Sequence, residues 1–276
     1  MTGSGTQADP YIVSSWSEFT DVMGSSGSYI KFADGGGTID FNEVQPSGFT
    51  SPIVIYAFVD LNGWVWKNAR FTGQGRFEFH LYVRNGSIVD IYAEDMVSYC
   101  LYFYTSNVTQ NMKISGVYYG QNANNSELFF LSSYGSYGKH TFNACSFNVE
   151  VYGNNVGFTT YSASDSSYNA VLQDCNMKVK IKGTTSAYLG RVQLENTLIS
   201  GSIAAPTINR CGNACVYSIL DMEINQTVTS GTASSICLYN NEKATFSGIS
   251  NMVGVSSTQL RNAEYLRSLG FPIGVD

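Results

Sequence analysis

The sequence predicts an all-β protein, a right-handed parallel β-helix with three faces, about eight coils and a short helical cap at each end. A degenerate unit recurs along the chain, its residues alternate with period two, and both ends carry amphipathic segments. The unit comprises an apolar residue, any residue, a bend residue and a small or apolar residue. It starts at anchors that are 17 to 30 residues apart: Trp66, Val83, Met112, Phe142, Leu172, Leu194, Ile219 and Phe246.

Alternation within each unit predicts strands with one buried face. Cys175, Met177 and Val179 alternate with Asn176 and Lys178, which is typical of a strand that packs on a core. Asn, Asp and Gly dominate the bend position because they tolerate left-handed backbone angles. The bend column consists of Asn68, Asn85, Ile114, Ala144, Asp174, Asn196, Asp221 and Gly248.

Another apolar run recurs after these paired strands and predicts a third strand in each coil. These runs are Cys100–Tyr104, Leu128–Ser132, Val156–Thr160, Ala187–Arg191, Cys215–Ser218 and Ile236–Asn240. Three strands per coil would give a solenoid with three faces.

The whole chain, residues 1–276, is expected to form one domain. Residues 1–40 would be a lead-in with a cap helix at Ser15–Met23, residues 41–254 the coils, and residues 255–276 a cap helix and tail. Apolar residues at helical spacing in both end segments predict these helices. We expect them to cover the open ends of the solenoid, where unpaired strand edges would invite aggregation.

Composition excludes several kinds of partner. Charged residues make up 13% and the net charge is −6, with no run of Lys or Arg, so nucleic acid is not an expected partner. No apolar stretch reaches the length of about 18 residues that a membrane span needs, and the start of the sequence resembles no secretory signal. We expect no membrane insertion and synthesis in the cytoplasm.

The cysteines do not predict a metal site or a cofactor. Most of the six cysteines lie in strand-like apolar runs, where a buried thiol behaves as a small apolar side chain. Cys211 and Cys215 have the spacing of half a zinc site, but no second pair completes it. We therefore expect reduced buried cysteines, no metal and no cofactor.

Two carboxylates are candidates for catalysis. Asp174 and Asp221 fall in the predicted bend column with Asn196 between them, so two coil steps would separate them by about 9.5 Å. That is at the upper edge of the spacing of about 6.5–9.5 Å in an inverting glycosidase. The demands of a bend explain both residues better than catalysis does, so the sequence favours a protein without enzymatic activity.

Tyrosines suggest a carbohydrate-binding surface instead. Aromatic rings can stack on sugars, and short polar side chains can bond their hydroxyl groups. The alternative is that some of these tyrosines point inwards or are buried between subunits of a trimer. The candidate sugar-binding residues, on the third strand and the turn after it, are Tyr102, Tyr104, Tyr134, Tyr161, Tyr188, Arg191, Tyr217 and Tyr239.

Both ends of the chain carry a family resemblance. The segments Gly5–Val13, Trp16–Phe19 and Tyr29–Phe32 together resemble the lead-in of many bacterial and phage β-helix surface proteins of the pectin-lyase-like class. Tyr265–Phe271 is similar to the last cap of such proteins in gut bacteria and their prophages. The resemblance implies a right-handed parallel β-helix and, for the phage members, a trimeric spike, fibre or decoration of the virion.

With this resemblance, we expect a structural protein of a phage or prophage virion, either a capsid or tail decoration or the tip of a spike or fibre. It would act in adhesion to a host surface or glycan, as a homotrimer at the virion surface. Its partners would be further copies of itself, other virion proteins and cell-surface polysaccharide. Two alternatives stay open: a polysaccharide depolymerase, as glycoside hydrolase or lyase, and an extracellular or cell-surface bacterial adhesin.

Overall fold

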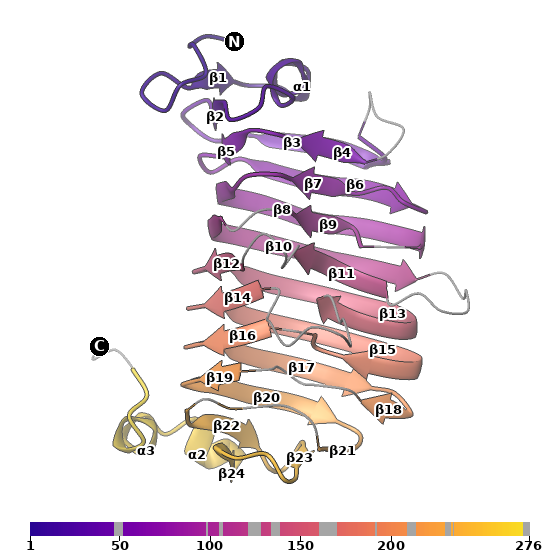
Figure 1. Ribbon diagram of the computed structural model, residues 1–276, viewed down its shortest axis with the longest axis vertical. Coiled ribbons are helices and arrows are strands. Elements are labelled where there is room, and N and C mark those ends of the chain that lie inside the picture. Colours follow the sequence, from indigo (N-terminus) through magenta and orange to yellow (C-terminus); the bar gives the residue numbers. More distant parts are fainter. Residues whose placement is uncertain are drawn as a thin grey trace.

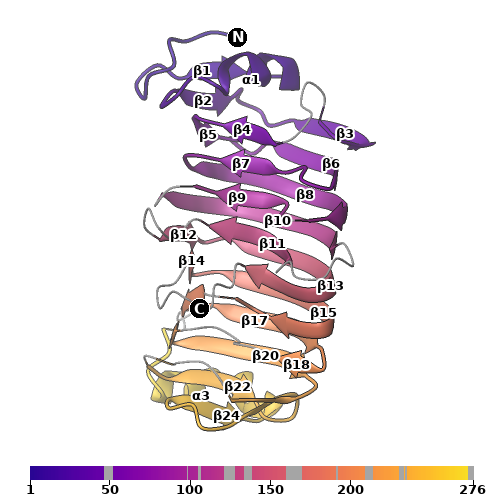
Figure 2. The ribbon, with the colours of Figure 1, turned by 45° about the vertical axis from the view of Figure 1, so that its right-hand side comes forward.

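Parallel strands stack along the long axis of the molecule in a computed structural model of the chain (Figures 1 and 2). The structure describes residues 1–46, 52–97, 99–104, 107–120, 128–133, 139–159, 170–190, 192–208, 214–229, 233 and 235–272. These residues form an all-β protein with one long parallel sheet, which is consistent with a β-solenoid. The predicted fold class is therefore confirmed at this level.

The pairings between the described strands form three ladders. The first ladder contains β1 (Tyr11–Val13), β2 (Tyr29–Phe32), β5 (Phe58–Asp60), the starts of β8 (Val83–Met96) and β10 (Val108–Gly120), β12 (His140–Asn143), β14 (Ala170–Gln173), β16 (Val192–Glu195) and β19 (Ala214–Val216). The second ladder contains β3 (Thr38–Val44), β6 (Val65–Thr72), β8, β10, β13 (Ser146–Thr159), β15 (Asn176–Tyr188), β17 (Leu198–Ala204), β20 (Ser218–Ile224), β22 (Cys237–Asn240) and β24 (Met252–Val255).

The third ladder is built from shorter segments. It contains β4 (Ile53–Ile55), β7 (Phe77–Phe79), β9 (Leu101–Phe103), β11 (Leu128–Ser133), the ends of β13 and β15, and β18 (Thr207–Ile208). A separate pair joins β21 (Thr227–Val228) to β23 (Thr245–Phe246). Two of the predicted third strands are assigned wrongly, because β19 pairs with β16 of the first ladder and β22 pairs with β20 of the second.

A column of left-handed residues turns the chain from the first ladder into the second. Its members have φ between 44° and 56°: Asn62, Asn85, Asn111, Ala144, Asp174, Asn196 and Tyr217. The prediction was right for Asn85, Ala144, Asp174 and Asn196. It was wrong for Asn68, Ile114 and Asp221, which lie within the second ladder, where Ile114 pairs with Ile88 and Asp221 with Ser200. Gly248 has a φ of 71° but follows β23, outside this column.

Two of the cysteines, Cys145 and Cys175, lie directly after a bend, where their thiols form hydrogen bonds. There the side chain donates a hydrogen bond to the carbonyl group of the residue before the bend. Cys145, Cys175, Thr197 and Ser218 bond in this way to Asn143, Gln173, Glu195 and Val216, over 3.4, 3.3, 2.9 and 3.1 Å. The carbonyls of Gln173, Glu195 and Val216 also accept the backbone N–H of the bend residue in the preceding coil, so the side-chain donor uses the second acceptor position of the oxygen. The thiols of Cys100, Cys145 and Cys175 are free and buried, and Cys237 is buried.

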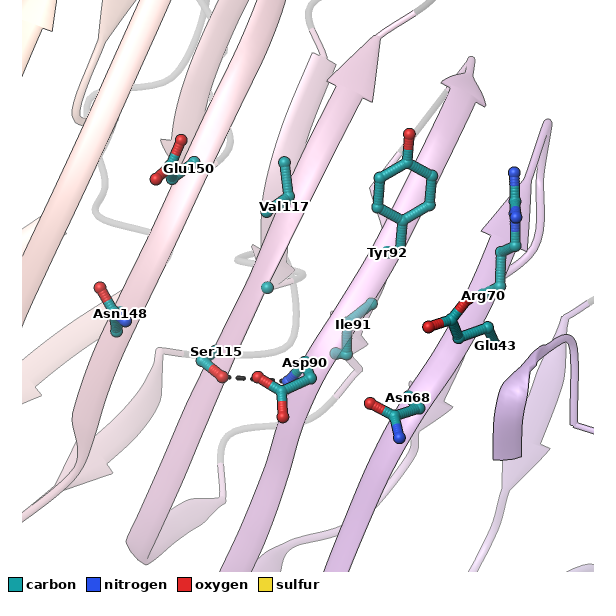
Figure 3. Close-up of a pocket in the computed structure, with 11 residues that line it drawn as sticks. Glu43, Asn68, Arg70, Asp90, Ile91, Tyr92, Ser115, Val117, Asn148 and Glu150 are labelled. Atoms are coloured by element: carbon teal, nitrogen blue, oxygen red, sulfur yellow. Dashed lines mark hydrogen bonds between the residues drawn. The ribbon is translucent and has the colours of Figure 1, made fainter. Parts of the chain in front are cut away.

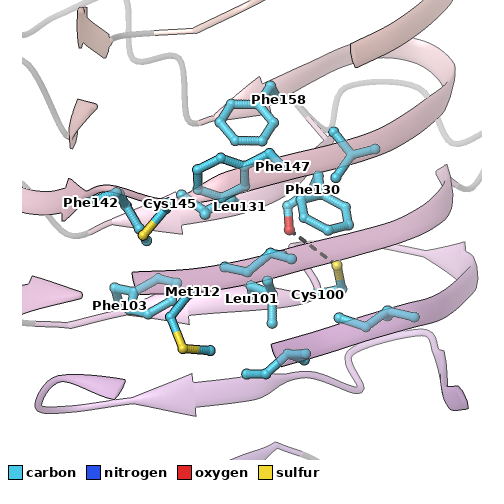
Figure 4. Close-up of a cluster of buried hydrophobic side chains, with 14 of the residues drawn as sticks. Cys100, Leu101, Phe103, Met112, Phe130, Leu131, Phe142, Cys145, Phe147 and Phe158 are labelled. Carbon is cyan, nitrogen blue, oxygen red and sulfur yellow. Dashed lines mark hydrogen bonds between the residues drawn. The ribbon is translucent and has the colours of Figure 1, made fainter. Parts of the chain in front are cut away.

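Aromatic rings in the core connect the ladders (Figure 4). Phe103 of the third ladder contacts Phe142 of the first, with ring centroids 4.9 Å apart. Phe142 contacts Phe147 of the second ladder at 5.7 Å, and Phe147 contacts Phe158 at the end of β13 at 5.3 Å. All four rings are buried, and each pair adds about 0.5–1.5 kcal/mol beyond the burial itself.

Helices lie at both ends, as the sequence predicts. Helix α1 (Trp16–Val22) is capped by the Ser15 hydroxyl, which accepts from the backbone N–H of Glu18. At the other end the structure has two helices instead of the single predicted one, α2 (Ser257–Leu260) and α3 (Ala263–Ser268). Asn262 begins α3 because its side chain accepts from the backbone N–H of Tyr265, and this N-cap interrupts the expected helix.

Candidate functional site

The two candidate catalytic carboxylates lie at different places in the coil. Asp174 is at the bend, where it accepts a hydrogen bond from Asn196 Nδ2 over 2.6 Å. The register aligns Asp174 with Asn196 and Tyr217, and Asp221 lies four residues beyond Tyr217 in β20. The predicted alignment of the two acids in one bend column is therefore wrong.

Asp221 is held by two partners on its own side of the sheet. Asn240 Nδ2 donates to its carboxylate over 2.7 Å, and Lys243 Nζ lies 2.9 Å away. Partial burial raises the pKa of Asp221, but the Asn240 amide and the Lys243 ammonium lower it more, so the pKa falls below its usual range. An ionised carboxylate with these partners serves to join β20, β22 and the segment after β22.

The predicted sugar-binding tyrosines do not share one face. Tyr102 and Tyr188 are buried along the third ladder, at 6% and 2% exposure. Tyr104 stacks on His80 at 4.4 Å, Tyr239 contacts Phe246 at 4.7 Å, and Tyr217 lies against Phe271 at 5.7 Å. Tyr134, Tyr161 and Arg191 lie outside the described residues. Carbohydrate contact by these residues stays a prediction.

A hollow crosses the outer surface of the second ladder instead (Figure 3). It has a volume of about 450 Å³ and spans the strands from β3 to β13. Its lining combines acidic, amide, hydroxyl and aromatic side chains over a floor of Ile91 and Gly116. The lining residues are Glu43, Asn68, Arg70, Asp90, Ile91, Tyr92, Ser115, Gly116, Val117, Asn148 and Glu150.

A change of register between β8 and β10 shapes this hollow. Asn68 and Asp90 have left-handed backbones, with φ of 58° and 55°. Ile114 of β10 pairs with Ile88 of β8 and Gly116 pairs with Ile91, so β10 has one residue fewer than β8 between the two pairs. The Asp90 N–H donates to Ser115 Oγ over 3.0 Å. A Cβ atom on Gly116 would lie 2.6 Å from the Ile91 carbonyl oxygen. The backbones can approach this closely only because Gly116 has no side chain.

A tyrosine ladder lies beside the hollow. Tyr92, Tyr119 and Tyr152 belong to β8, β10 and β13, and their ring centroids are 5.8 and 5.1 Å apart. Arg70 lies over the Tyr92 ring at 5.1 Å, and Lys180 over the Tyr152 ring at 5.4 Å. Tyr92 and Tyr119 are 38% and 40% exposed. Neighbouring rings and cations occupy ring faces, so this ladder offers mainly ring edges and hydroxyl groups to a ligand.

A second hollow continues the first across β15, β17 and β20. Its volume is about 380 Å³, and it shares Asn148 and Glu150 with the first hollow. The remaining lining residues are Val149, Lys178, Val179, Lys180, Gly201, Ser202 and Glu223. We call the two hollows together the outer groove.

Glu150 stands between the two hollows as an ionised group. It accepts a hydrogen bond from the Tyr152 hydroxyl, and Lys180 Nζ lies 3.2 Å from it. The Tyr152 hydrogen bond and the Lys180 ammonium lower the pKa of Glu150. Burial and the Glu150 carboxylate raise the pKa of Tyr152, while Tyr152 and Glu150 raise the pKa of Lys180. At neutral pH the three groups are therefore a carboxylate, a phenol and an ammonium.

Alternation within single strands shows that these tyrosines face outwards, but it could not predict that they form a ladder. Tyr92, Tyr119 and Tyr152 each face outwards in strands whose alternate residues are buried. Only the correct register between β8, β10 and β13 places them beside one another. The bend predicted at Ile114 lies three residues beyond the true bend at Asn111. The predicted alignment therefore did not place Tyr119 beside Tyr92 and Tyr152.

Within the described part of the chain, no group of three or more His, Cys, Asp or Glu side chains is placed to hold a metal ion. No helix among these residues is long and apolar enough to cross a membrane. No family model matches the sequence, no curated protein matches it, and no solved structure matches the fold.

Proposed function

We propose that the chain is a right-handed parallel β-helix of the pectin-lyase-like type, with three faces and about eight coils. The three ladders of parallel pairs support the three faces. Right-handed crossovers between parallel strands are nearly universal, which supports the handedness. The regular stacking of the described strands along the long axis supports a single solenoid domain (Figure 2).

We propose that this solenoid binds a glycan through the outer groove. The observation that carries the proposal is the combination of amide, hydroxyl, carboxylate and tyrosine side chains along adjacent strands of one ladder. Such groups bond sugar hydroxyls, and a sheet holds them in fixed positions. Asn148 and Glu150 are central because both line the two hollows, and Asn148 is the one without an ion-pair partner on β15.

The ionisation of the groove favours binding over catalysis. Glycoside hydrolysis needs a carboxylic acid whose pKa is raised so that it can donate a proton. The pKa of Glu150 is lowered instead, so it is not a proton donor at neutral pH, and the pKa values of Tyr152 and Lys180 are raised, so neither is deprotonated to act as a base. These directions suit fixed hydrogen bonding and support adhesion.

We further propose that the protein is a homotrimeric decoration, spike or fibre tip at the surface of a phage or prophage virion. The support is the resemblance of Gly5–Val13 and Tyr265–Phe271 to the ends of such proteins. Adhesion to a host glycan would then attach the virion to its cell, with other virion proteins as further partners. Measurement of the mass in solution tests the assembly, and a monomer at micromolar concentration would contradict it.

Binding of host-surface polysaccharides by immobilised protein tests the groove directly. We expect Asn148→Trp to lower glycan affinity about tenfold or more, because an indole would occupy space shared by both hollows. Ser146→Trp is the matched control, since Ser146 is exposed on the same strand but lines neither hollow.

If both variants lose glycan binding equally, or if neither loses it, a site in the groove would be contradicted. Release of reducing ends or unsaturated products from the bound glycan would instead establish the depolymerase alternative. Asp174→Asn and Asp221→Asn would then show whether either carboxylate takes part.

A further inference from the structure

Lysines form a row on the outer surface of β15. Lys178, Lys180 and Lys182 alternate with the buried residues Val179 and Ile181, so all three point away from the core. Alternate residues of a strand are about 6.6 Å apart, which places the outer two lysines about 13 Å from one another along the strand. The row is conspicuous in a protein whose net charge is −6.

The three lysines differ in how they are neutralised. Lys180 is paired with Glu150 at 3.2 Å and lies against the Tyr152 ring. The side chains of Lys178 and Lys182 form no ion pair or hydrogen bond with any residue that the structure describes. Two ammonium groups with unused donors therefore flank a fixed, neutral pair.

The neighbouring strand leaves room for a ligand beside this row. The register places Ser200, Ser202 and Ala204 of β17 next to Lys178, Lys180 and Lys182. These small side chains do not cover the lysines, and the second hollow opens over Lys178, Lys180 and Ser202. Hydroxyl groups next to ammonium groups suit a ligand that carries both anionic groups and sugar hydroxyls.

We propose that the glycan bound in the outer groove is an acidic polysaccharide, whose carboxylate or sulfate groups pair with Lys178 in the second hollow and with Lys182, which follows it on β15 just outside the groove. This inference rests on the proposed glycan binding and specifies the chemical class of the ligand. Glu43 and Asp90 in the first hollow and Glu223 in the second repel such a polymer, so its anionic groups would lie over the lysine row and away from these carboxylates. Lys180 stays paired with Glu150, which lines both hollows.

A binding panel tests the inference with defined polymers. Hyaluronan carries carboxylates, dextran sulfate carries sulfates, dextran is the neutral parent, and polyglutamate is a polyanion without sugar rings. We expect binding of hyaluronan or dextran sulfate but not of dextran, and weaker binding of polyglutamate. The acidic polymer that binds shows whether carboxylate or sulfate is preferred, and its affinity should fall with added salt because salt screens exposed charges.

Paired variants assign the binding to the row. We expect the double variant Lys178→Gln and Lys182→Gln to weaken binding of the acidic polymer about tenfold. The double variant Lys31→Gln and Lys67→Gln removes the same charge from coils near the N-terminus and should leave the affinity unchanged. All four lysines are at the surface of strands, so circular dichroism should confirm that both double variants fold.

Several outcomes would overturn the inference. Unchanged affinity in the Lys178 and Lys182 variant, or equal loss in the control variant, would remove the row from the site. Binding of dextran as tight as that of the acidic polymers would leave glycan binding intact but reject an acidic ligand. Polyglutamate binding as tight as hyaluronan and dextran sulfate would reduce the effect to charge alone. Binding of no polymer in the panel would overturn this inference, while the host-polysaccharide assay with Asn148→Trp decides the proposed function separately.

Discussion

Tyr119 stacks on Tyr152 with ring centroids 5.1 Å apart and ring planes inclined by 13°. The two residues belong to adjacent strands of the second ladder and lie beside the wall of the outer groove. Tyr92 extends the stack on one side, and Lys180 covers it on the other. The stack therefore adds side-chain contacts between β8, β10, β13 and β15 outside the core.

Truncation of the central ring should weaken this coupling. We expect Tyr119→Ala to lower the free energy of unfolding by about 1–2 kcal/mol, because it removes contacts with rings on both sides. Tyr119→Phe keeps the ring and should stay close to wild type. Urea unfolding followed by circular dichroism measures the difference, and equal losses in both variants would mean that the hydroxyl group, not the ring, carries the effect.

Gly116 should not tolerate a side chain. We expect Gly116→Ala to cost about 1–3 kcal/mol, because its Cβ atom would meet the Ile91 carbonyl oxygen at 2.6 Å and force β8 and β10 apart. Gly24→Ala is the control, since no atom lies within 4 Å of a Cβ atom built there. Thermal unfolding compares the two variants. A Gly116→Ala protein as stable as Gly24→Ala would show that the floor of the groove can relax.

For the side chain that follows each bend, the hydrogen-bond donor should matter more to stability than the size of the side chain. Thr197 Oγ1 lies 2.9 Å from the carbonyl oxygens of Leu172 and Glu195, and it accepts from the backbone N–H of Cys175. Thr197→Val keeps the shape but leaves buried polar groups unpaired, so we expect a loss of about 1–3 kcal/mol.

Thr197→Cys is the matched control, because cysteine fills the corresponding position in two neighbouring coils. We expect its midpoint in urea to lie between those of wild type and Thr197→Val. A Thr197→Val protein as stable as wild type would show that water or backbone adjustment satisfies the freed groups.

Stability should depend on the charge of Asp221 at acid pH. Its folded-state pKa is below the usual value, so its contribution is present above the unfolded pKa of about 3.9 and is lost as pH falls through the lower folded pKa. We expect the stability difference between wild type and Asp221→Asn to be constant near neutrality and to shrink below about pH 4. Urea midpoints measured from pH 7 downwards give this difference, and one that does not change with pH would contradict the assignment.

Local chemistry made part of the fold predictable. Asn85, Asp174 and Asn196 occupy left-handed bends because their side chains and backbones suit that conformation. Helix α1 could be located from Ser15 and Glu18, since a capping hydroxyl and an acidic first turn are local signals. The strand faces followed from alternation, as in β15, where buried and exposed residues change places at every step.

Register was less predictable, because it depends on contacts between coils. Ala144 and Tyr217 adopt the same left-handed bend as Asn196 without a residue type that announces it. Missing Tyr217 moved the expected bend to Asp221 and created an apparent pair of catalytic acids. The bends predicted at Asn68 and Ile114 likewise lie six and three residues beyond the left-handed residues Asn62 and Asn111.

The sequence by itself determined that this chain forms strands with one buried face, separated by turns and bounded by cap helices. These features follow from side-chain period and backbone preference within a few residues. Only the tertiary structure decided which outward side chains meet, and so created the tyrosine ladder and the outer groove. The alternation of a strand determines which face of the sheet each side chain lies on. The side chains beside it belong to coils that are tens of residues away in the sequence, and packing of the whole core selects the register between these coils.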